Sequence, residues 1–359
     1  MTDVAIGSAP ARGIHAHGWS RATTATWLGH RAALLGIGLF FIAFAVVIVV
    51  PALKVNSAYG WYLAHACTPD STGACQAHFV TVAREHTWAN TVGFLLLLFP
   101  LAAGVFVGAP LIAKELESGT FRFTWTQAMG RSRFELRRLV VLGVVVIACA
   151  CVLGLLMGWF IHPLETLRQN SRWDSRLFNS TVVTLPAWTL FSFTLGAFLG
   201  VAIRRTVPAM AATTIVAGAL LVFAGEPAEG SRGSLTTRLI GLFPTVARSR
   251  TWIGTTFSGT STGERFAPRG SWVVRTFTET PKGKPLRDIF GTRLWTSLVR
   301  GVKGNPTPGR LLTDHHYTFW YTYQPAARYW TFELALTGTA VILGAILVFA
   351  TVRVIRRVG

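Results

Sequence analysis

Residues 114–138 read KELESGTFRFTWTQAMGRSRFELRR and lie between two long runs of apolar residues. The stretch mixes acidic and aromatic side chains with many basic ones, among them Lys114, Arg137 and Arg138. A polar segment between two membrane spans has to lie at a membrane face, and a surplus of Lys and Arg favours the cytoplasmic face. We therefore predict that residues 114–138 form a cytoplasmic loop.

Two features suggest that this loop has a defined structure. Gly119 follows a helical run that continues out of the preceding span, and a glycine can end a helix by adopting the left-handed conformation. The residues after it are rich in aromatic side chains, which predicts a short element lying against the inner membrane surface. The alternative is an ordinary interhelical loop with no special role.

The composition of the chain is that of a membrane protein. Its 359 residues are 51% hydrophobic and only 14% charged, and the mean hydropathy is +0.45. These values indicate a polytopic membrane protein rather than a soluble domain. The net charge of +19 would suit a nucleic-acid partner, but the basic residues are spread over several loops. We therefore expect anionic membrane lipid, and no nucleic acid, to face this charge.

Six apolar runs are each long enough for a helix across roughly 30 Å of hydrocarbon. An open sheet cannot span lipid, so we expect helices. The fold prediction is an all-α polytopic membrane protein with six transmembrane helices and a large extracytoplasmic loop between the fifth and sixth. We place the helices near residues 33–53, 89–113, 139–161, 181–203, 207–225 and 331–352, the fifth being the shortest.

The distribution of Lys and Arg sets the predicted orientation. The proposed inner segments carry far more of them than the short outer loops, which places both termini in the cytoplasm. We predict four regions. They are a cytoplasmic tail and interfacial helix at 1–31, five spans at 32–225 containing the loop 114–138, an extracytoplasmic cap at 226–330, and the last span with a cytoplasmic C-terminus at 331–359.

Proline, glycine and acidic residues mark special positions in the spans. Pro100 and Pro110 predict kinks in the second span. Gly196 and Gly200 form a GxxxG pair in the fourth span, a spacing that is common in helix bundles and is weak evidence for a dimer face. No acid or base lies in the middle of a span, although an ion-driven carrier would usually have one. We expect Glu333, near the outer end of the last span, to reach the membrane interface.

The loops contain candidates for a disulfide and for metal ligands. Cys67 and Cys75 lie in an outward loop, where an oxidising environment permits either a disulfide or two free thiols. His315 and His316 follow Asp314, but adjacent side chains rarely converge on one ion, so we expect no metal site. We expect the basic segment 226–330 to form a small, irregular cap of short helices or strands, because pure disorder lacks its recurring tryptophans.

Motifs for known enzyme classes are missing. The chain has no G-x-x-x-x-G-K-[ST] phosphate loop, so we do not expect it to hydrolyse ATP itself. It also lacks H-E-x-x-H and G-x-S-x-G. A membrane-embedded enzyme would need a polar nucleophile or histidine within a span, and no such set is visible. We therefore expect a protein that is not an enzyme.

The stretch from Ala109 to Thr120 resembles the cytoplasmic loop of ABC-transporter permeases of the type-2 exporter family. In that family a Glu-x-x-Gly-Thr element follows the second span, and an Arg-containing turn such as residues 130–133 precedes the third. The resemblance implies that the loop contacts a separate ATP-hydrolysing subunit, which would hold ATP and Mg. It carries the ATPase-coupling role over to Glu115, Glu117, Gly119, Thr120, Arg131 and Arg133.

Two further stretches resemble actinobacterial members of this family. Residues 323–333, YQPAARYWTFE, are similar to the Pro-x-x-Arg-Phe/Tyr-Trp-x-Phe approach to the last span. Residues 26–31, TWLGHR, are similar to a Thr-Trp-x-x-His-Arg start, with a departure at Leu28 and Gly29. The resemblance implies a location in a bacterial plasma membrane.

The resulting hypothesis is the membrane-spanning subunit of an ABC exporter of hydrophobic or amphipathic compounds, such as drugs, lipid-like molecules or secondary metabolites. The family resemblance implies a partner ATPase and a second permease copy or paralogue. It also implies a path near the second and fifth helices, for which we name Phe94, Phe99, Phe106 and Phe223, although each could simply face lipid. The alternative hypothesis is a non-transporting sensor or assembly protein whose basic extracytoplasmic loop binds an anionic partner.

Overall fold

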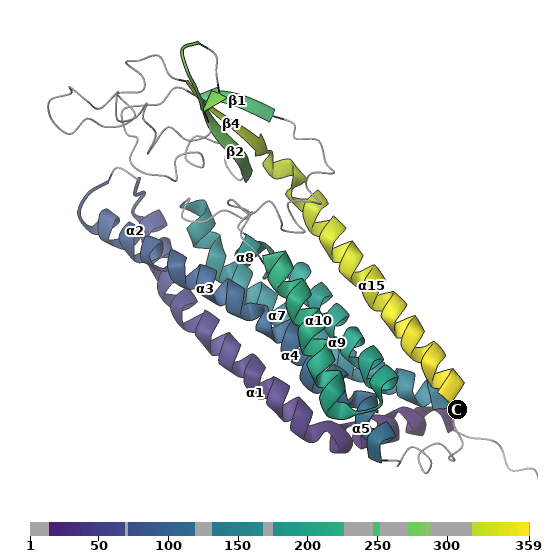
Figure 1. Ribbon diagram of the computed structural model, residues 1–359. Helices are drawn as coiled ribbons and strands as arrows, with labels where there is room; N and C mark the ends of the chain where they lie inside the picture. The colour runs from purple at the N-terminus through teal and green to yellow at the C-terminus, as the bar shows by residue number, and fades with distance from the viewer. Residues whose placement is uncertain are drawn as a thin grey trace, which may run out of the picture.

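The protein forms a bundle of long helices with a small β-sheet at one end (Figure 1). The computed structural model describes the backbone of residues 14–68, 71–118, 131–167, 175–225, 247–251, 272–282, 285–286 and 318–358. It describes the side chains of residues 35–68, 71–117, 137–167, 177–221, 279–282 and 325–356. We call the two ends of the bundle the sheet end and the α5 end.

The first half of the bundle comprises α1 and a broken second segment. Its elements are α1 (Ile14–Ala64), α2 (Ala74–Arg84), α3 (His86–Leu96), α4 (Leu98–Ala102), the π-helix η1 (Ala103–Gly108) and α5 (Pro110–Ser118). The second half comprises α7 (Arg131–Thr166), α8 (Ser175–Phe178), α9 (Thr184–Ile203), α10 (Thr206–Gly225), η2 (Ala326–Arg328) and α15 (Tyr329–Val358).

In the part of the chain that the structure describes, five helical stretches are long and apolar enough to cross a membrane. They are Leu35–Ala64, Ala74–Glu117, Arg137–Thr166, Thr184–Ile203 and Ala326–Arg356. The predicted fifth span coincides with α10, but the apolar stretch described there, Thr206–Leu221, is shorter than a full span. In its described part, the structure therefore supports a multi-pass membrane protein with five candidate spans and α10 as a further, shorter apolar helix.

The described parts of the chain between α10 and α15 contain four strands. They are β1 (Ala247–Thr251), β2 (Trp272–Glu279), β3 (Pro285–Leu286) and β4 (Thr318–Gln324), and they form an antiparallel sheet in the order β1-β4-β2-β3. β2 and β4 are rich in aromatic and Thr or Val residues, which favour strands. The all-α prediction therefore holds for the bundle, whereas this segment contains strands, one of the two alternatives expected for the cap.

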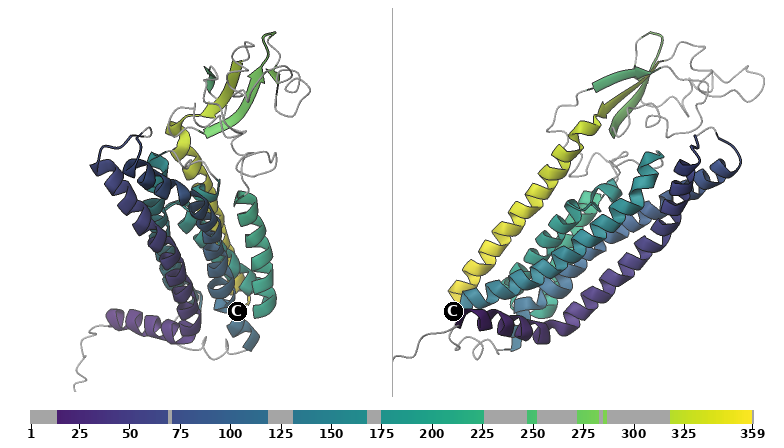
Figure 2. Two further views of the ribbon diagram at one scale, coloured as in Figure 1. Left: turned by 90° about the vertical axis from the view of Figure 1, so that its left-hand side faces the viewer. Right: turned by 180° about the vertical axis from the view of Figure 1, so that it is seen from behind.

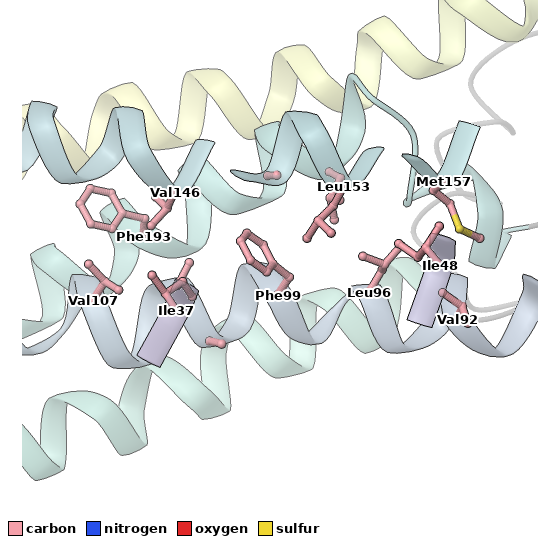
Figure 3. Close-up of a cluster of buried hydrophobic side chains, with 14 of the residues drawn as sticks. Ile37, Ile48, Val92, Leu96, Phe99, Val107, Val146, Leu153, Met157 and Phe193 are labelled. Carbon is pink, nitrogen blue, oxygen red and sulfur yellow. The ribbon is translucent and has the colours of Figure 1, made fainter. Parts of the chain in front are cut away.

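The core of the bundle is a layer of apolar side chains between α1, the second segment, α7 and α9 (Figure 3). Phe99 from α4, Phe193 from α9 and Met157 from α7 are fully buried in it. α9 is buried along most of its length and is the central helix, whereas α1 and α15 expose long rows of apolar side chains. Rows of this kind suit contact with lipid or with another membrane protein.

Both prolines of the second segment coincide with a change in its helical geometry. Leu97 separates α3 from α4, three residues before Pro100. The π-helix η1 ends just before Pro110, and Ala109 N donates to Gly104 O at 2.8 Å, a bond that spans five residues. Proline cannot donate its own backbone bond, and π-bulges are a common way to absorb such a defect. The regular α-helix is therefore interrupted near both prolines at which kinks were predicted.

The first and last helices both reach the α5 end of the bundle. The first turns of α1 bend across the α5 end, so the predicted interfacial helix and the first span form one continuous helix (Figure 2). α15 runs the length of the bundle from the sheet to the C-terminus (Figure 1). The C-terminus and α5 therefore lie at the same end.

Candidate functional site

The short helix α5 lies at the end of the bundle opposite the sheet (Figure 1). It continues directly from η1, and its apolar side consists of the buried residues Leu111, Ile112 and Ala113. Lys114 and Glu117 are exposed on its other side. One face of α5 therefore packs on the bundle while the charged face is accessible.

Glycines bring the second segment and α9 into backbone contact just above α5. A Cβ placed on Gly104 would lie 2.5 Å from the carbonyl oxygen of Ser192, and one on Gly108 would meet the carbonyl oxygen of Phe193. From the other side, a Cβ on Gly196 would lie 2.8 Å from the backbone nitrogen of Ala109. Real Cβ atoms do not approach backbone atoms this closely, so the contact requires glycine.

Gly200 belongs to the same contact, because a Cβ there would meet the carbonyl oxygen of Ala109. The GxxxG pair of Gly196 and Gly200 therefore packs within the subunit, against η1 and the start of α5. It is thus no evidence for a dimer face. We call this contact between η1–α5 and α9 the glycine joint. A joint of two backbones leaves no side-chain layer that could slide or repack.

An ion pair connects α5 to the start of α7. A guanidinium nitrogen of Arg138 donates to Oε1 of Glu115. The Arg138 side chain is only 9% exposed, so this pair is shielded from water far more than a surface ion pair. Removing either partner would leave a poorly hydrated charge behind. Glu115, which was predicted to lie in the coupling loop, thus holds two consecutive segments of the bundle together.

Glu117 connects α5 to α10. Its Oε2 accepts a hydrogen bond of 2.8 Å from the backbone nitrogen of Thr206, the first residue of α10. A carboxylate at this position satisfies a helix donor that has no partner within the helix and is favoured by the helix dipole. The chain reaches this point through a tight turn in which Arg204 has a left-handed φ of 59°. Arg205 completes the turn and adds a positive charge next to Glu117.

α5 is therefore attached to three other helices. The glycine joint holds it to α9, Glu115 holds it to α7, and Glu117 holds it to the start of α10. α5 is therefore positioned to pass a displacement to all three, through a tight backbone contact with α9, an ion pair with α7 and an exposed hydrogen bond with α10. The spacing of the acids in the sequence indicated an inner loop, but their partners lie 23 and 89 residues away. Only the fold could identify them.

The structure describes little of the other predicted coupling residues. Gly119 and Thr120 lie outside the described residues, as do the side chains of Arg131 and Arg133. The backbone of Arg131 begins α7. The four phenylalanines named for a substrate path do not form one group. Phe94 and Phe106 are 48% and 58% exposed on the outer surface of the second segment.

Phe99 is fully buried, and its ring stacks on that of Phe40 at 6.2 Å between centroids, so it is a core residue in this structure. The side chain of Phe223 lies outside the described residues. The prediction of Phe99 as a lining residue is therefore wrong for this conformation. Phe99 lies on the face of α4 that points into the bundle. The sequence did not show which face this is, because nearly all neighbouring residues are apolar.

Cys67 and Cys75 form a disulfide with 5.7 Å between their Cα atoms. The bond closes the connection between α1 and α2 at the sheet end. Further along the same two segments, Lys54 Nζ lies 2.9 Å from Glu85 Oε1, and this ion pair connects α1 to the junction of α2 and α3. These two links stabilise the sheet end without involving α5.

Glu333 is a residue whose place the sequence did not predict. We expected it to reach the membrane interface, but its side chain is only 1% exposed. One carboxylate oxygen, Oε1, accepts hydrogen bonds from the hydroxyls of Thr181 and Thr184. The expectation was wrong because α8 and the start of α9 fold over the start of α15. No local pattern in the sequence shows this.

One comparison with known proteins gives a match. A family model described as ABC-2 membrane transporter related matches residues 38–226. This range runs from α1 to the end of α10 and includes α5, the glycine joint and both acids. Neither curated proteins nor solved structures give a match.

Proposed function

We propose, from the premise that this chain belongs to the ABC-2 membrane transporter related family, that it is the permease subunit of an ATP-driven exporter. The observation that carries the proposal is α5. It is a short helix with an accessible charged face, and it is joined to α7, α9 and α10. This arrangement would let an ATPase subunit that binds α5 from outside the bundle move the helices joined to it.

In the proposed mechanism an ATPase subunit binds the charged face of α5 and the loop that follows it. ATP and Mg are bound by that partner, whose closure displaces α5. The glycine joint is too tight to absorb the motion, so α9 and the second segment move together. Arg138 carries the motion to α7 through Glu115, and the turn at Arg205 carries it to α10 through Glu117. The bundle would then change between inward- and outward-facing states.

The permease is proposed to work as a pair with a second copy or a paralogue. α1, α15 and the outer side of the second segment carry the long apolar rows that could meet such a partner or lipid. Phe94 and Phe106 lie on this surface, where an interface between two permeases would form a path for apolar substrates. We propose export of a hydrophobic or amphipathic compound across a bacterial plasma membrane, with both termini in the cytoplasm.

Co-purification tests this proposal. The permease carries a C-terminal affinity tag, is extracted from its own host in a mild detergent and is assayed for ATP hydrolysis after elution. We expect a phosphate-loop ATPase to elute with it, and the substitution Glu117→Arg to remove most of that activity. Glu85→Arg is the matched control, because it makes the same charge reversal at the sheet end. A functional permease that elutes without any ATPase would contradict the proposal and favour the sensor hypothesis.

A further inference from the structure

A cavity of about 350 Å³ opens between α7 and α15 at the sheet end of the bundle. α7 contributes Gly154, Gly158 and Trp159 to its wall, and α15 contributes Trp330 and Glu333. Thr181 and its neighbours before α9 complete the lining. The volume is within the range of about 300–1,000 Å³ that is usual for sites of small organic ligands. This cavity lies far along the bundle from α5.

Glu333 is the exceptional side chain in this wall. The hydroxyls of Thr181 and Thr184 fix its Oε1, while its Oε2 is buried and has no hydrogen-bond partner among the described residues. A buried carboxyl oxygen without a donor is costly, and acids within membrane-spanning helices commonly mark a ligand or ion path. The two threonines hold the carboxyl group in place, so little reorganisation would be needed for it to meet a positive charge.

The charged residues around the cavity also favour a positively charged ligand. The whole chain has 34 Lys and Arg against 15 Asp and Glu. Among the described lining residues, however, there are two acids, Glu165 and Glu333, one imidazole from His162, and neither Lys nor Arg. In the described part of the wall, a cation would therefore meet the carboxyl group of Glu333 and no basic side chain.

The rest of the wall suits an apolar, aromatic body. Trp159 is 39% and Trp330 is 54% exposed, and both residues line the cavity. Indole rings attract organic cations through their faces as well as apolar groups through their area. Gly158 has nothing within 4 Å of the place where a Cβ would stand, so the α7 side of the cavity is open.

We propose that this cavity binds a lipophilic organic cation, with Glu333 supplying the charge complement and Trp159 and Trp330 the apolar contact. Its role as part of an export path rests on the proposed function, whereas the binding itself does not. The cavity would receive its ligand within the membrane half that adjoins the sheet. An amphipathic cation partitions there with its charge near the membrane surface and its apolar body in the hydrocarbon.

The test uses two ions of the same shape and opposite charge, tetraphenylphosphonium and tetraphenylborate. Equilibrium dialysis with purified permease in a maltoside detergent measures the binding of each. Tetraphenylphosphonium has no hydrogen-bond donor, so its preference reports charge and shape alone. We expect saturable binding of the cation, a weakening of about tenfold or more in Glu333→Gln, and no such weakening for tetraphenylborate.

Two substitutions control for shape and folding. Gly158→Phe would fill the open side of the cavity and should abolish binding, while Gly36→Phe, at another glycine with nothing within 4 Å, should leave it unchanged. Glu85→Gln removes a carboxylate from the same end of the bundle but outside the cavity and should also have no effect. If Glu333→Gln fails to give a monodisperse protein, Gly158→Phe decides the question.

The proposal is overturned if wild-type permease shows no saturable binding of tetraphenylphosphonium. It is also overturned if tetraphenylphosphonium binds equally well to wild-type permease and to the Gly158→Phe variant. Equal binding by folded Glu333→Gln permease would remove the assignment of that residue. These measurements contain no ATPase. A negative result together with normal co-purification of an ATPase would therefore reject the ligand class and leave the exporter proposal intact.

Discussion

The glycine joint and the seam between α7 and α15 are two contacts within one bundle, yet they are built in opposite ways. At the glycine joint, η1 and α9 touch backbone to backbone, and no side chain separates them. At the seam, α7 and α15 leave a cavity of about 350 Å³ beside a buried carboxyl group. The first contact is suited to transmitting a displacement, and the second is suited to holding a ligand.

The largest effect on stability should come from adding a methyl group at the glycine joint. Gly196→Ala places a methyl group against the Gly104 carbonyl and the Ala109 backbone nitrogen. Neither atom can rotate away, so we expect a loss of about 2–3 kcal/mol, seen as a fall of roughly 5–10 °C in melting temperature in detergent. Gly36→Ala, in open space, is the control. A melting temperature equal to that of wild type would mean that the joint is not tight.

The ion pair beside the joint should give the next largest effect. We expect Glu115→Gln and Arg138→Met each to lower the melting temperature, because each leaves a shielded charge without its main partner. The double variant should lose less than the sum of the two, with a coupling energy of about 1–2 kcal/mol. A double-mutant cycle of thermal unfolding measures this energy. Strict additivity would show that the pair does not hold α5 to α7.

At the seam between α7 and α15, replacing a glycine by alanine should raise the stability instead of lowering it. Gly158→Ala meets nothing within 4 Å and removes the backbone freedom of a glycine in the unfolded chain. We expect a gain of about 0.5–1 kcal/mol, or a rise of roughly 1–3 °C in melting temperature. Gly154→Ala, one turn away, should instead be destabilising, because its Cβ would lie 2.7 Å from the Cα of Val182. Equal effects of the two changes would argue against the open cavity wall.

A change at Glu117 should affect ATP-driven transport without affecting the stability of the fold. Its carboxylate is exposed and forms one hydrogen bond to the start of α10, so Glu117→Gln should leave the melting temperature unchanged within error. ATP-driven transport should nevertheless fall, because the link between α5 and α10 is weakened. Glu85→Gln, the same change of charge at the sheet end, is the control and should leave transport unchanged. A lower melting temperature in Glu117→Gln would place this residue in the structural group with Glu115.

The sequence was sufficient for the general architecture because hydrophobic length is a local property. The runs near 33–53, 139–161 and 331–352 are helices in the structure, and Pro100 and Pro110 mark the irregular segment between α3 and α5. The strands after α10 were harder to predict. Glycine, proline and charged residues interrupt that region, so the short β-rich pieces at β2 and β4 gave no clear alternation.

The site was less predictable because its contacts are long-range. A local resemblance suggested Glu115 and Glu117 as coupling residues, but it could not identify their partners Arg138 and Thr206. The GxxxG spacing was visible, yet only the fold shows that it faces η1 within the same chain. Glu333 looked like an interface residue because its burial depends on α8 and the start of α9, which are distant in sequence.

The central claim is that α5 faces the cytoplasm, where an ATPase can bind it. Single cysteines placed by Lys114→Cys and Lys282→Cys, in a background with Cys149 and Cys151 replaced by alanine, report on the two ends of the bundle. An impermeant thiol reagent is applied to intact cells and then to permeabilised cells. We predict that the Lys282→Cys protein reacts in intact cells and the Lys114→Cys protein only after permeabilisation. Labelling of the Lys114→Cys protein in intact cells would contradict the account.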